Sequence, residues 1–366
     1  MRVLFLILVF LCIELAWAQS WKKLQQQGQK YLQQNQLSEA LKTFEKSAAK
    51  AQKEFGNQSN AYWVSQRHIA EIYGKLQNYE KAEMLYLQGL AYLQNYPHTA
   101  EYYNYTLNIA LLYREQKLYK KAENYLSQVY EFVWKNEGEN STEYQRVCNL
   151  LGHNYLNLQD YEKAIFWFEK SLKAAEKKGK DSEDYADVLS NLASVYREQG
   201  NYEKAEVSII EAKNIRAKIF GKKHEDYFLS LNNLASLYSD IGKYEQAETI
   251  YKELLQGVGD NLGEKHTLYP LINYNRASLY ERKGDWLNAE KYYQIALKAY
   301  QEQLKKIDVA TCLTELGNLY LLQGLYERAE KNLLEAQEIY KQYEAGNKIP
   351  SKYQPRNQKL LANLYT

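Results

Sequence analysis

The chain has 366 residues, of which 45% are hydrophobic and 25% are charged, and its formal net charge at pH 7 is +2. One compact core does not need a chain of this length. No stretch concentrates Lys and Arg, so the sequence lacks the basic footprint of a nucleic-acid-binding protein, and we expect no nucleic-acid partner.

Residues 1–18 have the composition of a secretory signal. After a basic start, residues 3–11 are apolar, and Ala16-Trp17-Ala18 supplies small residues at a cleavage site before Gln19. Glu14 interrupts the apolar run, which is then too short to span a bilayer. We therefore predict a signal peptide over 1–18 and an exported, periplasmic or extracellular protein with no transmembrane segment after cleavage. An uncleaved anchor is the alternative.

The rest of the chain repeats one spacing of small and aromatic residues. A Tyr follows a small residue by three positions in nine pairs: Gly28/Tyr31, Ala70/Tyr73, Ala110/Tyr113, Gly152/Tyr155, Ala193/Tyr196, Ala235/Tyr238, Ala277/Tyr280, Gly317/Tyr320 and Ala362/Tyr365. A second Ala lies twelve residues after each of the first eight small residues: Ala40, Ala82, Ala122, Ala164, Ala205, Ala247, Ala289 and Ala329. A fixed separation inside a period of about 41 residues indicates a stacked helical repeat.

Residues 189–213 show why each unit is a pair of helices. Leu189, Leu192, Ala193 and Tyr196 share one helical face, and Tyr202, Ala205, Ile209 and Ala212 share another. Gly200 lies between them, where a helix would end. We call the first helix of each unit helix A and the second helix B. The Ala residues are the expected points of close approach.

This pattern resembles the tetratricopeptide repeat, which places a small residue and Tyr in helix A and Ala, an aromatic and a small residue in helix B. The strings LNNLASLY (231–238) and NYEKAE (201–206) are most similar to the long repeats of the kinesin light chain type. The Pro that closes a 34-residue unit is absent, so helix B is expected to run longer. The resemblance implies an all-α, right-handed superhelical solenoid of stacked antiparallel helix pairs, with eight repeats over residues 19–345.

The recurring Glu-Lys-Ala-Glu runs at the start of helix B are interpreted as solvated helix faces that carry neighbouring charge pairs.

Residues 346–366 break the rhythm of the array. Gly346, Pro350 and Pro355 indicate a linker, and Ala362 with Tyr365 then restores the helix A pattern. We predict either a capping helix or the first helix of a ninth repeat. The second case would leave an apolar C-terminal edge that could mediate self-association.

Nothing in the sequence indicates catalysis, a cofactor or a metal. The His residues lack metal-ligand spacing, and no Gly-rich phosphate loop or nucleophile motif is present. His98, His224 and His266 recur at similar positions before helix A, which favours a structural role in the loop. Cys148 and Cys312 lie four repeats apart, too far for an internal disulfide, and are interpreted as small buried hydrophobes.

The resemblance implies that helix A lines a concave groove and that polar residues beside its packing stripe face a ligand. Asn108, Asn191, Asn233 and Asn275 each stand two residues before the small residue of helix A. Asn both donates and accepts, so such a ladder can bind the backbone of an extended peptide, as the similar Asn does in kinesin-light-chain-like repeats. In the alternative interpretation, Asn bonds a neighbouring helix and belongs to the repeat consensus. Arg114, Arg197 and His153 are expected to reach the same groove, where Arg would favour an acidic segment.

We therefore predict a non-catalytic scaffold of an exported bacterial protein that binds a peptide or protein segment in its groove. The alternative is the sensory half of a longer effector, whose caspase-like peptidase or kinase module would lie beyond residue 366.

Overall fold

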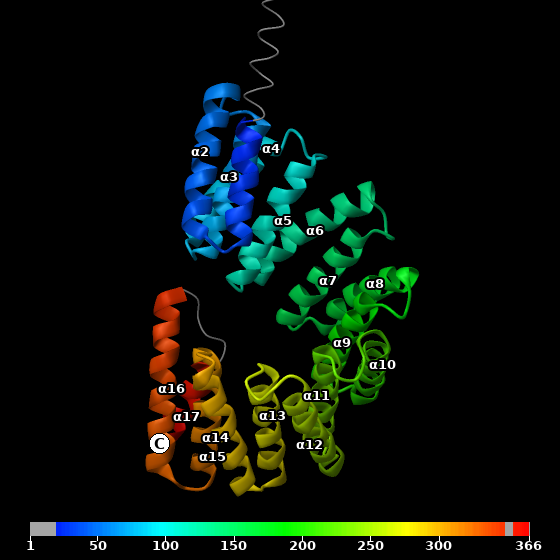
Figure 1. Ribbon diagram of the computed structural model, residues 1–366, viewed down its shortest axis with the longest axis vertical. Helices are drawn as coiled ribbons and strands as arrows, with labels where there is room; N and C mark the ends of the chain where they lie inside the picture. The colour runs from blue at the N-terminus through cyan, green and yellow to red at the C-terminus, as the bar shows by residue number, and fades with distance from the viewer. Residues whose placement is uncertain (1–19, 348–353, 366) are drawn as a thin grey trace, which may run out of the picture. The chain divides into compact units, whose positions relative to one another are not determined.

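The computed structural model describes residues 20–347 and 354–365, and every regular element in these ranges is a helix (Figure 1). A first helix covers residues 20–33. The others are α2 (Leu37–Phe55), α3 (Asn60–Lys75), α4 (Tyr79–Leu93), α5 (Ala100–Glu115), α6 (Tyr119–Asn136), α7 (Thr142–Asn157), α8 (Tyr161–Lys178), α9 (Glu183–Glu198), α10 (Tyr202–Phe220), α11 (Glu225–Asp240), α12 (Tyr244–Asn261), α13 (Leu268–Lys283), α14 (Trp286–Glu302), α15 (Lys306–Leu322), α16 (Tyr326–Asn347) and α17 (Gln354–Leu364). The predicted signal peptide lies outside the described residues.

The helices form two compact units, Met1–Gln159 and Asp160–Thr366, which we call unit 1 and unit 2. Unit 1 contains the first helix and α2–α7, and unit 2 contains α8–α17. Within each unit, short turns connect consecutive helices that pack side by side in opposite directions, as in α13 with α14 and α15 with α16 (Figure 1). The predicted all-α solenoid of stacked antiparallel helix pairs is confirmed. The predicted limits of the repeat array, residues 19 and 345, remain predictions.

Local capping explains where helix A begins. Side-chain oxygens of Ser59, Thr99, Ser141 and Ser182 each accept a hydrogen bond from the backbone N–H three residues later. Before α11 and α13, His224 and His266 take this role: each Nδ1 accepts a hydrogen bond from the backbone N–H two residues later, at 3.3 Å. The predicted structural role of these two histidines is thus confirmed.

The turn from helix A to helix B has one left-handed residue, seven positions after the small residue. This residue is Gly at 200, 242, 284 and 324, but it is Asn35, Gln77, Lys117 and Gln159 in the other repeats, with φ between 56° and 60°. A residue with a side chain is strained in this conformation, whereas Gly is not. The second group of turns therefore carries a local cost.

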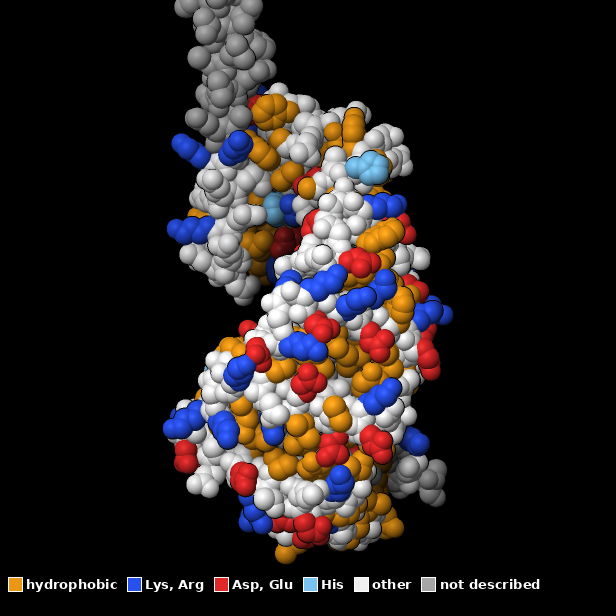
Figure 2. Space-filling model, turned by 90° about the vertical axis from the view of Figure 1, so that its right-hand side faces the viewer, with side chains coloured by type: hydrophobic (Ala, Val, Ile, Leu, Met, Phe, Trp, Pro, Cys, Tyr) orange, Lys and Arg blue, Asp and Glu red, His pale blue; other side chains and the backbone are white. Residues whose placement is uncertain are grey.

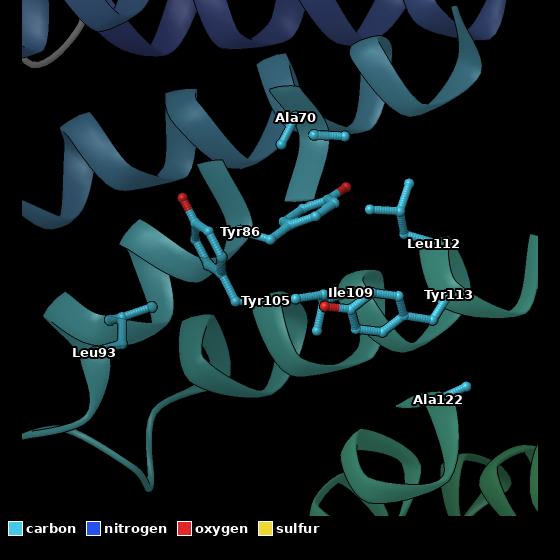
Figure 3. Close-up of a cluster of buried hydrophobic side chains, with 9 residues drawn as sticks. Ala70, Tyr86, Leu93, Tyr105, Ile109, Leu112, Tyr113 and Ala122 are labelled. Atoms are coloured by element: carbon cyan, nitrogen blue, oxygen red, sulfur yellow. The ribbon is translucent and has the colours of Figure 1, made fainter. Parts of the chain in front are cut away.

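The core lies where small residues let helices approach, and Figure 3 shows one cluster of it in unit 1. Ala70 and Ala122 are fully buried, and the rings of Tyr86 and Tyr105 meet edge to face with centroids 6.0 Å apart. The Tyr105 hydroxyl donates to the carbonyl oxygen of Trp63 at 2.6 Å, which satisfies its polar end. A Cβ at Gly89 would lie 2.1 Å from the Tyr105 ring, so only Gly fits there. Cys148 and Cys312 are also buried, as predicted.

The start of helix B is exposed and carries neighbouring charge pairs such as Lys252 with Glu248, as predicted, but this interpretation was incomplete. The helix A Tyr of one repeat donates to the Glu that directly follows the helix B Ala of the preceding repeat: Tyr113 to Glu83, Tyr155 to Glu123, Tyr238 to Glu206, Tyr280 to Glu248 and Tyr320 to Glu290, at 2.7–2.9 Å. We call these bonds the Tyr–Glu ladder. It joins successive repeats, a contact between residues about 30 positions apart that helical periodicity does not reveal.

Helix α17 packs on α15 and α16, just as the helix A α5 packs on the two helices α3 and α4 of the preceding repeat. Tyr365, directly after the helix, donates to Glu330, which continues the Tyr–Glu ladder. Asn357 is fully buried and donates to the carbonyl oxygen of Leu333 at 3.0 Å. Ala362, the equivalent of the buried helix A Ala elsewhere, is exposed because the described residues place no helix B over it.

Candidate functional site

In unit 1, Asn108 on α5 lies at a cavity of about 150 Å³. It is half-buried, and Tyr86 from α4 lines the same cavity. Glu71, Lys75 and Glu115 line the same cavity. Burial raises the pKa of Glu115, and nearby Lys75 opposes that shift. Asn108 therefore lies at a cavity whose lining includes charged side chains and a tyrosine of the neighbouring helix.

In unit 1, Arg114 on α5 lies near enough to His153 on α7 for its charge to act on the imidazole. The Nε of Arg114 is buried and has no hydrogen-bond partner within the described residues. Burial lowers the pKa of this guanidinium, with a smaller opposing effect of Tyr119. Burial, and then the charge of Arg114, lower the pKa of His153 to about 4, so its imidazole is neutral at pH 7. The pair combines a desolvated cation with a neutral imidazole.

The three asparagines of unit 2 have different environments. Asn191 on α9 is half-buried, and Asn233 on α11 is exposed. Asn275 on α13 donates from Nδ2 to Oδ1 of Asn232 on α11 at 3.0 Å. At this position the asparagine bonds the neighbouring helix, as in the alternative interpretation of the ladder.

Arg197 belongs to a network of two ion pairs that joins three A helices, α9, α11 and α13. Its Nε donates to Oδ2 of Asp240 on α11, and Oδ1 of the same carboxylate lies 3.0 Å from Nη2 of Arg282 on α13. The Asp240 side chain is 14% exposed. One carboxylate thus neutralises part of both guanidinium charges, and Arg197 differs from Arg114 in having an acidic partner.

A second polar cavity of about 410 Å³ lies in unit 2 between α13, α14, α15 and α17. Tyr274, Tyr293 and Trp286 supply aromatic lining, and Glu281 and Glu315 supply carboxylates. The rings of Tyr274 and Tyr293 lie 5.5 Å apart in an edge-to-face arrangement. We call this the acidic–aromatic pocket.

The two carboxylates of this pocket differ in their partners. Glu281 accepts from the Tyr293 hydroxyl at 2.8 Å and from Nδ2 of Asn318 at 3.0 Å. Glu315 accepts through Oε2 from Nη2 of Arg356 on α17 at 2.6 Å. Burial raises the pKa of Glu315 to about 7 despite the opposing charge of Arg356, and Glu281 adds to the rise. Glu315 is therefore a carboxylate that strongly requires a cation.

The predicted site residues divide between the units. Unit 1 contains Asn108, Arg114 and His153, and it brings the last two together; unit 2 contains Asn191, Asn233, Asn275 and Arg197. Asp240, Glu281 and Arg356 were not predicted as site residues. For Asp240, the only indication in the sequence was its place on a helix A, one repeat after Arg197. For Arg356, the sequence held no indication of a partner.

The visible surface mixes both signs of charge. Figure 2 shows Lys and Arg side chains interspersed with Asp and Glu on the face that it displays. Within residues 20–347 and 354–365, no helix combines the length and apolar character needed to cross a membrane. The same residues contain no group of three or more His, Cys, Asp or Glu side chains placed to hold a metal ion.

Solved structures with a similar fold include three proteins. A tetratricopeptide repeat protein from Parabacteroides merdae ATCC 43184 is 18% identical, with 80% of this chain and 99% of that chain covered and a TM-score of 0.56. The apo form of RapI is 15% identical, with 82% and 99% covered and a TM-score of 0.58. Aspartyl phosphate phosphatase F from Bacillus subtilis is 16% identical, with 80% and 75% covered and a TM-score of 0.57. At these identities the likeness concerns the fold alone.

Sequence comparison identifies the family. No curated protein matches the chain significantly. A tetratricopeptide repeat profile matches residues 57–135, 99–177, 144–206, 184–257 and 269–342, and a second such profile matches residues 232–303. The chain belongs to the tetratricopeptide repeat family.

Proposed function

We propose that this protein is a non-catalytic interaction scaffold, exported from the cytoplasm, that binds an extended segment of a partner protein along its A helices. The repeat family and the fold support a role in protein binding. The observation that carries the proposal furthest is the pair Arg114 and His153 in unit 1, because Arg114 is a desolvated cation to which the described residues give no acidic partner.

Arg114 differs from most arginines of the described chain. Arg67, Arg146, Arg197 and Arg216 each form an ion pair with a carboxylate. Burying part of a guanidinium without such a partner costs free energy, which an incoming carboxylate would offset through a charge-assisted hydrogen bond. The neutral His153 adds no second charge. This combination favours an acidic side chain of the partner segment.

Asn108 offers a second polar group on α5. Its amide lies six positions before Arg114 on the same helix, at the edge of the 150 Å³ cavity. An extended segment whose acidic side chain reaches Arg114 would bring its backbone towards α5, where a polar amide can bond it whatever its sequence.

Binding of a peptide library tests this proposal. Residues 19–366 would be titrated with blocked peptides that contain Glu, Gln or Lys in an otherwise constant background. We expect the Glu peptides to bind best, and Arg114→Gln to remove that preference. Arg146→Gln is the matched control, since Arg146 is on α7 and already pairs with Glu143. Equal binding of Glu and Gln peptides by the unaltered chain would refute the assignment.

The asparagine ladder needs a separate test. The triple change of Asn191, Asn233 and Asn275 to Ala is expected to weaken peptide binding more than any single change, since each neutral hydrogen bond contributes ~0.5–1.5 kcal/mol. Asn275→Ala alone should also lower stability, because its amide bonds Asn232. A triple variant that melts early but binds normally would assign all three to the packing of the repeats.

Export is tested by the N-terminus of the natural product. We expect a mature chain that begins at Gln19 in secreted or periplasmic material. A start at Met1 in a membrane fraction would favour the anchor instead.

A further inference from the structure

The acidic–aromatic pocket of unit 2 is independent of the Arg114 surface and has the opposite preference for charge. Its carboxylates come from two helices, Glu281 from α13 and Glu315 from α15, and its walls include the rings of Tyr274, Tyr293 and Trp286. The Glu315 side chain is 10% exposed. A carboxylate so deeply buried is stable as an anion only beside a cation.

Within the described residues, an arginine of the same chain supplies this cation. Arg356 of α17 reaches Glu315 with Nη2 at 2.6 Å, while its own side chain remains 57% exposed. The other arginine at the pocket, Arg282, is directed to Asp240 at 3.0 Å. Arg356 thus forms the ion pair with Glu315, and it lies at the solvent side of the cavity.

Helix α17 does not depend on Arg356 for its attachment. Asn357 is fully buried, donates to the carbonyl oxygen of Leu333 and accepts from the hydroxyl of Thr314 at 3.2 Å. Leu361 is 7% exposed, and Tyr365 bonds Glu330. Because these contacts fix the helix, the guanidinium of Arg356 can leave Glu315 without detaching α17.

We propose that the acidic–aromatic pocket binds the guanidinium group of an arginine in a partner segment, and that Arg356 occupies the pocket when this partner is absent. A guanidinium matches the lining better than an ammonium, since its planar fork fits a carboxylate and its face stacks on aromatic rings. The proposal uses the scaffold function above only in assigning the guanidinium to a partner segment, and it requires nothing of unit 1.

Removing the internal occupant provides the test. A blocked pentapeptide with one central Arg would be titrated calorimetrically into the unaltered chain and into Arg356→Ala, at a pH above the pKa of Glu315. If Arg356 holds the pocket about nine-tenths of the time, the variant should bind roughly tenfold more tightly. Arg328→Ala is the matched control, because it removes a different exposed arginine, on α16. It should leave the affinity unchanged.

Further titrations test whether the pocket recognises a guanidinium and whether that group belongs to a peptide. The same peptide with citrulline, the neutral analogue of Arg, should not bind, and Glu315→Gln added to Arg356→Ala should abolish binding of the Arg peptide. N-acetylarginine amide should bind more weakly than the peptide. Equal binding of this small molecule would refute the assignment to a partner segment, and binding of citrulline would refute the guanidinium pocket.

Two variants keep the result interpretable. Circular dichroism would show whether Arg356→Ala is folded, and Arg356→Gln offers a side chain that can still hydrogen-bond Glu315 without its charge. Failure of both folded variants to bind the Arg peptide more tightly than the unaltered chain overturns the proposal. Arg114→Gln should not alter this affinity, so failure at one surface leaves the other untouched.

Discussion

The Tyr–Glu ladder predicts a specific loss of stability from the removal of one hydroxyl. In Tyr238→Phe, the ring stays in place but Glu206 loses the hydrogen bond that it accepts at 2.7 Å. Repeat 5 offers the matched control, Tyr196→Phe, because Ile165 stands where the ladder requires a Glu. Both rings lie under a lysine, Lys243 at 5.0 Å and Lys204 at 5.3 Å, so this cation–π contact is common to the two sites.

The structure sets the size of the effect. A hydrogen bond to a charged group contributes ~1.5–3 kcal/mol when it is buried. The Glu206 side chain is 26% exposed and also has Lys243 at 3.4 Å, so solvent and a second partner reduce the loss. We therefore expect Tyr238→Phe to lower the free energy of unfolding by about 1 kcal/mol more than Tyr196→Phe.

Urea unfolding followed by far-UV circular dichroism measures this difference, and urea avoids the ionic screening that guanidinium chloride would impose. Glu206→Gln adds a second check, since a neutral acceptor should retain only part of the bond. Equal losses in Tyr238→Phe and Tyr196→Phe would show that the ladder bonds contribute nothing net, and the inferred coupling between repeats would then be wrong.

Three other predictions follow from single positions. Ala235 is fully buried on α11, so Ala235→Leu should cost ~1–3 kcal/mol by overpacking, and an unchanged thermal melt would place the close approach elsewhere. Gln159 has φ of 59°, so Gln159→Gly should raise stability by ~0.5–1 kcal/mol in urea unfolding; a loss would mean that the turn is not strained. The pKa of His153 falls from 6.5 to about 4 on folding, so between these pH values the unfolded chain binds a proton that the folded chain does not. The free energy of unfolding is therefore unaffected by His153 above pH 6.5 and decreases as the pH falls towards 4, by at most about 1.4 kcal/mol per pH unit. His153→Gln should flatten this part of the pH profile of stability, and an identical profile would contradict the assignment.

The sequence by itself determined the helices, their pairing and most of the small and aromatic residues at which they pack. Ala and Tyr at a fixed helical separation place both residues on one face, and a period of about 41 residues can bury those faces only by stacking. The structural role of His224 and His266 was also predictable, because both stand at the same place before helix A, and recurrence at one place in the repeat favours a role in the loop.

Only the tertiary structure decided which polar side chains meet. Asn233 and Asn275 hold the same place in the repeat, yet one is exposed and the other bonds Asn232. Arg114 and Arg197 hold the same place as well, but only Arg197 has Asp240 as a partner. Periodicity fixes the face of a helix on which a residue lies. The offset between stacked helices and the depth of burial determine its partner, and both arise only when the repeats pack together.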